Sequence, residues 1–392
     1  MPFRTLRSLT RLAMAVGAAV ALSAAVASSQ HSAQRGALRG AQRGAQRGAL
    51  RGALRGALRG ALRGALRGTV RTRAQPSTNL LAPGSRVLLD AHNAYPERGQ
   101  WTDRIDRAIA TGVPVAIEQD LYWYKPPGGD QYVAVVAHDD DALEGAPTLD
   151  AYFFARIRPI IEQALRDNKR EQWPLIVLNL DFKDNLPAHL DAVWALLGQY
   201  EAWLTTAQKT ATPHVQERFV VGPLLVLCGS DTAQRRRFHD EVPVGTSLRA
   251  FGAAVPTAIP GLTKPQRVRR AVRMSAAAHI PQPADNFARW VNFPWNVVEE
   301  GGQPKAGAWS TRDSVRLLAF AERAHTRGYW IRFYTLDGFA ESENRGYSSG
   351  YNFGNVDAAR VRWRATIAAG VDFVATDQYE DFATVRQATR SR

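Results

Sequence analysis

Four short apolar runs in the first half of the chain each end in polar side chains. They lie at residues 88–95, 115–123, 132–139 and 175–183, and their bodies consist mainly of Val, Ile, Leu and Ala. Apolar strands with polar groups at their carboxyl ends are typical of a parallel α/β barrel, in which those ends meet at one face. The pattern therefore predicts that seven side chains converge on one site: His92, Asn93, Glu118, Asp120, His138, Asp181 and Lys183.

The rest of the chain continues this alternation of strands and helices. Strands are predicted at 86–91, 115–121, 132–137, 175–182 and 219–227, and further strands near 248–254, 290–292, 329–335 and 373–375. Helices are predicted at 101–111, 149–167, 186–206, 311–327 and 356–369. Repeated βα units over about 315 residues favour one domain, a TIM-type (β/α)8 barrel, regular or distorted, at 77–392. The pattern is weakest over 229–290.

The first thirty residues have the pattern of a secretory signal. Arg4, Arg7 and Arg11 precede an apolar run over 12–27, which closes with Ala-Val-Ala. This run of about sixteen residues is short for a membrane-spanning helix, and no Cys follows it that would carry a lipid anchor. We expect residues 1–27 to be a cleaved signal peptide and the protein to be secreted or periplasmic. An uncleaved N-terminal anchor is the alternative.

Residues 28–76 contain a four-residue repeat, RGAL or RGAQ, from about 34 to 68. Gly at every fourth position opposes a helix, and nothing in the repeat can build a core, so a disordered linker is predicted. Clustered Arg is attracted to anionic lipid or cell wall, which allows a peripheral membrane or envelope contact. A plain linker is the favoured interpretation.

The repeat also explains the charge of the whole chain. The formal net charge is +14, but residues 1–75 hold 14 of the 50 Lys and Arg residues and no Asp or Glu. The remaining 36 basic residues balance 36 acidic ones, so the predicted barrel is neutral. Nucleic-acid binding is therefore not expected. A single Cys, Cys228, excludes an intrachain disulfide and is expected to be core packing.

The polar strand ends carry groups that suit a metal and proton transfer. Glu118 and Asp120 are two apart on one strand and leave it on the same face, and Asp181 adds a third carboxylate. Hard oxygen ligands favour one divalent cation, Mg²⁺ or Ca²⁺, over Zn²⁺. Two imidazoles beside a metal, here those of His92 and His138, suit phosphodiester cleavage, because one can act as the base while the other acts as the acid. The alternatives are a surface carboxylate pair and structural histidines.

Three further side chains are candidates for charge stabilisation or substrate contact. Lys183 lies on the same face as Asp181 and is expected to steady phosphate charge, with an ion pair as the alternative. Tyr122 and Trp123 follow the carboxylates and are expected to form a substrate wall or a lipid-facing rim, with barrel packing as the alternative. Arg332 is expected to be a further substrate contact. Barrel packing is favoured for four others: Asn292, Trp295, Thr335 and Asp337.

The order of these residues resembles the phospholipase C-like phosphodiesterase superfamily. His92, Glu118-x-Asp120, His138-Asp139 and Asp181-x-Lys183 carry the resemblance over 86–185. The segment GVDFVATDQYEDF at 370–382 looks like the closing strand of a glycerophosphodiester phosphodiesterase barrel. The superfamily includes glycerophosphodiester phosphodiesterases, phosphatidylinositol phospholipases C and sphingomyelinases D.

Two departures point away from the glycerophosphodiesterases. Asn93 stands where they have Arg, and His92-Asn93-Ala94-Tyr95 is similar to the HNTY-type motif of eukaryotic-style phospholipase C and to the fungal "altered inheritance of mitochondria" branch. Asp181 stands where they more often have Glu. The resemblance implies a cation held by Glu118, Asp120, Asp181 and Asn93, with His92 as the base and His138 as the acid.

The expected function is that of an exported, metal-dependent phosphoric diester hydrolase or lyase. Its substrates would be glycerophosphodiesters or phospholipid head-group diesters, and a monomer is expected. One alternative is a sphingomyelinase D-like lyase that forms a cyclic phosphate. Another is a catalytically inactive barrel that serves as an envelope-binding module. No glycine-rich nucleotide loop follows a predicted strand, so a nucleotide cofactor is not expected.

Overall fold

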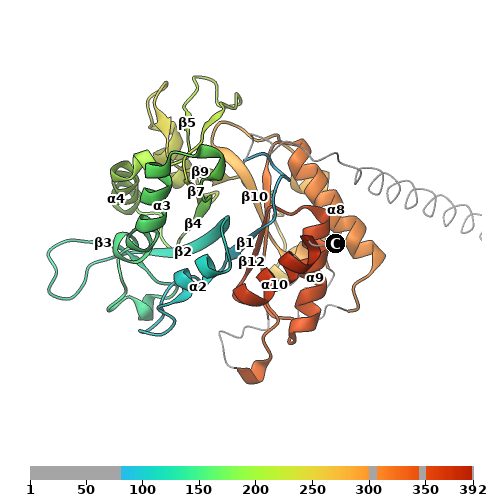
Figure 1. Ribbon diagram of the computed structural model, residues 1–392. Coiled ribbons are helices and arrows are strands. Elements are labelled where there is room, and N and C mark those ends of the chain that lie inside the picture. Colours follow the sequence, from blue (N-terminus) through green and yellow to red (C-terminus); the bar gives the residue numbers. More distant parts are fainter. Residues whose placement is uncertain (1–80, 300–306, 344–349, 391–392) are drawn as a thin grey trace, which may run out of the picture. The chain divides into compact units, whose positions relative to one another are not determined.

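A computed structural model describes residues 81–299, 307–343 and 350–390 (Figure 1). The chain divides into two units, Met1–Ser77 and Thr78–Arg392, and all the described residues belong to the second. The predicted signal peptide and the repeat lie outside the described residues.

Eight parallel strands close into a barrel, which confirms the predicted (β/α)8 fold. Around the barrel they follow the order β1 (Leu88–Ala91), β2 (Val115–Tyr124), β4 (Ile176–Phe182), β7 (Leu224–Cys228), β9 (Phe251–Ala253), β10 (Ala288–Pro294), β11 (Trp330–Tyr334) and β12 (Phe373–Thr376). The barrel closes because β1 pairs with β12 on one side and with β2 on the other. The carboxyl ends of all eight strands therefore meet at one face.

The run predicted as a strand at 132–137 is not a barrel strand. It forms β3 (Val133–Val136), which is antiparallel to β2, from Leu121 opposite Val136 to Tyr124 opposite Val133. The Pro- and Gly-rich turn at 125–130 explains this, because a parallel crossover needs a dozen or more residues. The hairpin extends β2 beyond the barrel face and carries His138 back towards it.

Helices surround the strands on the outside of the barrel (Figure 1). The main ones are α2 (Arg104–Ala110), α3 (Ala155–Asp167), α4 (Pro187–Gln199), α8 (Thr311–Thr326), α9 (Val356–Ala369) and α10 (Tyr379–Arg390). On α8 the buried residues Leu317, Phe320, Ala321 and Ala324 recur at helical spacing and face the core. Among the described residues, no helix combines the length and apolarity that crossing a membrane requires.

Two predicted elements are shorter than expected. The helix predicted at 186–206 ends at Gln199 and is followed by a 3-10 turn and by β5 (Thr206–Gln208). The strand predicted at 219–227 is interrupted at Gly222-Pro223, where Pro cannot donate to a ladder, giving β6 (Phe219–Val220) and β7. β5 pairs with β6 and with β8 (Ser247–Leu248) in a small separate sheet.

The region in which the sequence pattern is weakest holds short elements. Three short helices, α5 (Thr232–Arg235), α6 (Lys264–Ala271) and α7 (Ala276–His279), lie between β7 and β10. Cys228 is fully buried at the end of β7, and burial raises the pKa of its thiol. This placement is that of a core residue, as predicted.

Candidate active site

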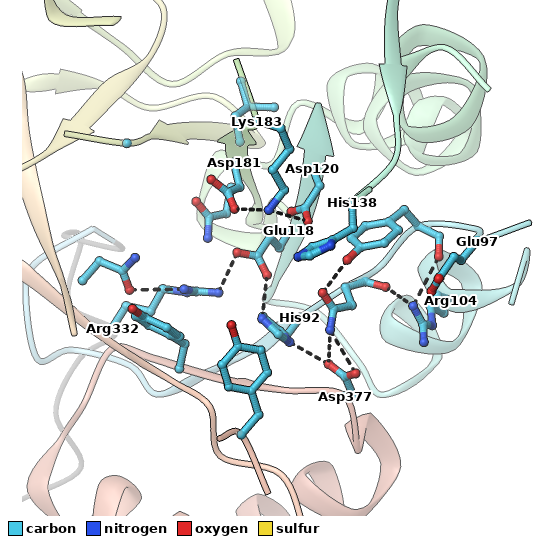
Figure 2. A pocket seen from close by; sticks show the side chains of 18 of the residues that line it. His92, Glu97, Arg104, Glu118, Asp120, His138, Asp181, Lys183, Arg332 and Asp377 are labelled. Atoms are coloured by element: carbon cyan, nitrogen blue, oxygen red, sulfur yellow. Dashed lines mark hydrogen bonds and ion pairs between the residues drawn. The ribbon is translucent and has the colours of Figure 1, made fainter. Parts of the chain in front are cut away.

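A cavity of about 530 Å³ opens at the carboxyl ends of the barrel strands (Figure 2). The structure brings all seven of the converging polar residues to it, and Arg332 with them. Its other lining residues are Tyr95, Glu97, Trp101, Arg104, Asp139, Asn179, Leu180, Gly229, Trp290, Asn292, Tyr334, Tyr351 and Asp377. A cavity of this size can hold a small substrate, and several polar side chains of its wall would face that substrate.

Three carboxylates form what we call the carboxylate cluster: Glu118, Asp120 and Asp181. The parallel register of β2 and β4 places Asp120 opposite Asp181. Glu118 lies two residues before Asp120 on β2, so its side chain leaves the strand on the same face. One oxygen from each carboxylate lies within 4.8 Å of the others. The buried Oε2 of Glu118 has no hydrogen-bond partner among the described residues. A buried carboxylate oxygen without a hydrogen bond, beside two further carboxylates, fits a hard divalent cation, which takes oxygen ligands.

Two cationic side chains balance the carboxylate cluster, Lys183 and Arg332. The ammonium of Lys183 lies 2.9 Å from Asp120 Oδ2 and 2.7 Å from Asp181 Oδ2 (Figure 2). Burial beside Glu118 raises the pKa of Asp120 to about 8, although Lys183 opposes the shift. Burial lowers the pKa of Lys183, but the neighbouring carboxylates more than offset this and raise it above its usual value.

Arg332 lines the cavity but uses its guanidinium to hold other protein groups. It donates to Asp90, to Glu118 at 3.0 Å and to Asn292 at 3.2 Å, and it is 3% exposed. Each of its three nitrogens therefore already has a protein acceptor. In this arrangement Arg332 holds Glu118 in position. This role differs from the substrate contact that the sequence predicts.

His92 is held by a carboxylate that the sequence did not single out as a site residue. Its Nδ1 lies 2.7 Å from Asp377 Oδ1, and its Nε2 lies 3.5 Å from Glu118 Oε2 (Figure 2). Burial lowers the pKa of His92, but Glu118 and Asp377 outweigh it and raise the pKa to about 10. We call His92 and Asp377 the histidine–aspartate pair. It fixes the imidazole with Nε2 towards the carboxylate cluster.

Asn93 contacts the histidine–aspartate pair rather than the carboxylate cluster. Its φ of 52° is left-handed, which Asn tolerates better than most residues. Its Nδ2 donates to both oxygens of Asp377 at 3.1 Å, and its Oδ1 accepts from the hydroxyl of Tyr95 at 2.5 Å. Because Oδ1 is engaged by Tyr95, this arrangement differs from the expected role of Asn93 as a cation ligand.

Asp337 lies behind the histidine–aspartate pair. It accepts hydrogen bonds from the Thr376 hydroxyl at 2.6 Å and from the Asp377 amide at 2.7 Å. Burial next to Asp377 raises the pKa of Asp337 to about 7. In contrast, His92 and Asn93 lower the pKa of Asp377 against the effect of burial, so Asp377 stays ionised.

His138 stands at the rim of the same cavity, at the end of the β2–β3 hairpin. Its Nδ1 lies 2.7 Å from Asp139 Oδ1, and its side chain is 46% exposed. The ring stacks on Tyr95, with centroids 6.5 Å apart. Since Asp139 engages Nδ1, the other ring nitrogen is left for a ligand in the cavity.

The predicted aromatic wall of Tyr122 and Trp123 does not line this cavity. Trp123 stacks on Tyr132 and on His189 at the side of the hairpin, and its amide donates to Asp184. Other aromatics line it instead: Tyr95, Trp101, Trp290, Tyr334 and Tyr351. Of the weaker candidates, Asn292 lines the cavity, whereas Trp295 is buried and donates to Glu299.

No family model matches the chain, and no curated protein matches it. Solved structures do match it, and two of them are phosphodiesterases. A glycerophosphoryl diester phosphodiesterase from Parabacteroides distasonis is 13% identical, with 77% of this chain and 86% of that chain covered and a TM-score of 0.36. A calcium-dependent phosphoinositol-specific phospholipase C from Pseudomonas sp is 11% identical, with 78% and 93% covered and a TM-score of 0.42.

A dihydropteroate synthase from Burkholderia cenocepacia is also similar, at 15% identity, with 79% of this chain and 94% of that chain covered and a TM-score of 0.36. Likeness at this level does not separate one activity from another. The reaction is therefore argued from the side chains of the cavity.

Proposed function

We propose that the chain is a metal-dependent phosphoric diester hydrolase or lyase. One observation carries this proposal: the histidine–aspartate pair, the carboxylate cluster and His138 face one cavity. A fixed base, a second imidazole and a cluster of hard oxygen ligands are the groups that phosphodiester cleavage requires. Their convergence argues against the inactive envelope-binding module, for which none of them would be needed.

The carboxylate cluster would hold a divalent cation, Mg²⁺ or Ca²⁺, which supplies positive charge for a phosphate oxygen and for the attacking nucleophile. His92 accepts the proton of that nucleophile at Nε2, because Asp377 engages Nδ1. Asp377 then stabilises the imidazolium that forms. Only a neutral imidazole can accept this proton. Because the negative charge of Glu118 raises the pKa of His92, that charge has to be offset before His92 can act as a base.

Two side chains act on the leaving group and on the phosphate. His138 lies at the open rim and donates a proton to the departing alkoxide. The ammonium of Lys183 faces the cavity beside the carboxylate cluster, where it neutralises charge that develops on the phosphate oxygens.

The substrates we propose are glycerophosphodiesters or phospholipid head-group diesters. Water as the nucleophile gives a hydrolase, whereas a hydroxyl of the substrate gives a cyclic phosphate, as in a sphingomyelinase D-like lyase. The signal-like pattern of residues 1–27 supports export, so the enzyme would act in the periplasm or outside the cell. We propose that it acts as a monomer. The Arg repeat would add at most a peripheral envelope contact.

Turnover of bis(p-nitrophenyl) phosphate tests the reaction class. The protein is stripped with EDTA and then given Mg²⁺ or Ca²⁺. We expect activity to return with one cation and to be lost in Glu118→Gln and in His138→Ala. Glu162→Gln, at a half-exposed position on α3 that does not line the cavity, is the matched control and should stay active. Wild-type turnover in Glu118→Gln would overturn the proposal, and ³¹P NMR of the products separates hydrolysis from cyclisation.

A further inference from the structure

The ammonium of Lys183 contacts two of the carboxylates that would serve as ligands of a cation, Asp120 and Asp181. The backbone amide of Lys183 donates to the Leu121 carbonyl at 2.9 Å, which ties the end of β4 to β2. From there the side chain reaches back to Asp120 and Asp181, at 2.9 and 2.7 Å. The ammonium therefore already forms ion pairs with two members of the carboxylate cluster.

Glu118, the third member, is neutralised in a different way. It accepts from Arg332, which also donates to Asp90 and is 3% exposed. Movement of Arg332 away from this position would leave two buried carboxylates without their cation. Lys183 differs because its side chain is 18% exposed at the cavity, so its ammonium can turn from the carboxylates towards a ligand.

A divalent cation and the ammonium cannot share these oxygens without repulsion. Hard cations lie about 2.0–2.6 Å from their oxygen ligands. A cation on Asp120 and Asp181 would then lie within about 5 Å of the ammonium as it stands, and a charge of +2 beside a charge of +1 at that distance is repulsive even in water. Binding is eased if Lys183 gives up both carboxylates.

We propose that Lys183 is an internal counter-ion that competes with the cation for Asp120 and Asp181. This inference rests on the proposed function, since it concerns the same metal site. When the cation binds, Lys183 releases the two carboxylates and its ammonium becomes available to the phosphate of the substrate. Lys183 therefore weakens metal binding and couples it to phosphate binding, and the coupling works equally in both directions.

Calorimetric titration of the full chain with Ca²⁺ or Mg²⁺ tests the competition without using activity. We expect Lys183→Met to bind the cation at least about tenfold more tightly than the wild type, because the competing charge is gone. Lys183→Arg keeps the charge and should bind about as the wild type does. Lys209→Met is the matched control: its ammonium donates to the Asp240 carbonyl, away from the carboxylate cluster, and its affinity should not change.

A second titration, with inorganic phosphate, tests the coupling. Saturating cation should tighten phosphate binding to the wild type, and this gain should be lost in Lys183→Met. Equal or weaker cation binding by Lys183→Met would overturn the inference while leaving the metal site intact. Failure of both wild type and variant to bind any divalent cation would instead overturn the metal dependence of the proposed function. Lys183→Gln replaces Lys183→Met if that variant is not folded in EDTA.

Discussion

His92 and Asp377 are 285 positions apart in the chain, and their side chains lie 2.7 Å apart. Each follows a barrel strand directly, β1 and β12, and these two strands pair side by side where the barrel closes. Closure of the barrel thus sets the orientation of the candidate base. Through this contact, Asp377 fixes which ring nitrogen of His92 carries the proton.

Replacing Asp377 should impair turnover more than substrate binding. In Asp377→Asn the imidazole loses its anionic partner and the imidazolium its stabilisation, so we expect kcat to fall by about 10²- to 10⁴-fold with little change in KM. Steady-state kinetics measures both constants. Asp381→Asn removes an ion pair with Arg360 at the surface and is the control. A KM effect with unchanged kcat would contradict the role of Asp377 as the partner of the base.

The pKa of His92 should depend on the cation. In the metal-free protein Glu118 and Asp377 raise it to about 10, so the imidazole is charged at neutral pH. A cation on the carboxylate cluster offsets the negative field of Glu118 and should lower this pKa. NMR titration of the His92 ring with and without Ca²⁺ or Mg²⁺ measures the change. An unchanged pKa in a chain shown to bind the cation would argue against His92 as the base.

The same raised pKa makes a prediction for stability in EDTA. The folded-state pKa of about 10 lies above the ordinary value of 6.5, so folding favours the protonated imidazole. The resulting stabilisation is fully present below pH 6.5 and is lost as the pH rises through about 10. Denaturant unfolding of wild type and His92→Asn should therefore show a difference in free energy of unfolding that shrinks over that range. A constant difference would contradict the shift.

Arg332 should matter for folding as well as for the site. Arg332→Met leaves Asp90 and Glu118 buried without their cation, and we expect the free energy of unfolding to fall by about 3–5 kcal/mol. Urea unfolding measures this loss. Arg360→Met removes partly exposed ion pairs with Asp357 of α9 and with Asp381 of α10, and it should cost less than about 1 kcal/mol. A loss of similar size in both variants would show that Arg332 does not bridge buried carboxylates.

Export predicts a definite mature N-terminus. If residues 1–27 are a cleaved signal peptide, mass spectrometry of the exported protein should find a chain that begins at Ser28. Replacing Ala27 by a bulky residue should block this cleavage. An intact Met1 on protein recovered from the membrane would favour the uncleaved anchor.

The sequence predicted those features that repeat along one strand. Glu118 and Asp120 are two residues apart, so any strand places them on one face, and parallel strands bring Asp181 beside them. Apolar β-prone runs between helical segments predicted the barrel for the same reason. These inferences depend only on local period and on the rule that parallel strands end at one face.

Contacts that depend on the closed barrel were not predictable in this way. An Asp that follows a strand carries no local sign of its partner, so the sequence places Asp377 within the segment 370–382 without assigning it to the site. Asn93 and Arg332 line the cavity, as the sequence predicts. Their partners, Asp377 and Asp90, are far away in the sequence and come close only in the closed barrel. A hairpin strand and a barrel strand have the same period of two, so the pattern at 132–137 does not show that β3 lies outside the barrel.

Barrel closure also fixes when the chain becomes competent during its synthesis. β1 is the first of the described barrel strands to be synthesised, whereas its neighbour β12 and Asp377 follow all the other barrel strands in the sequence. The histidine–aspartate pair therefore cannot form until every barrel strand has been made and β12 has paired with β1. A chain that stops before Asp377 contains His92 but not its anionic partner, and the activity we propose cannot arise in it.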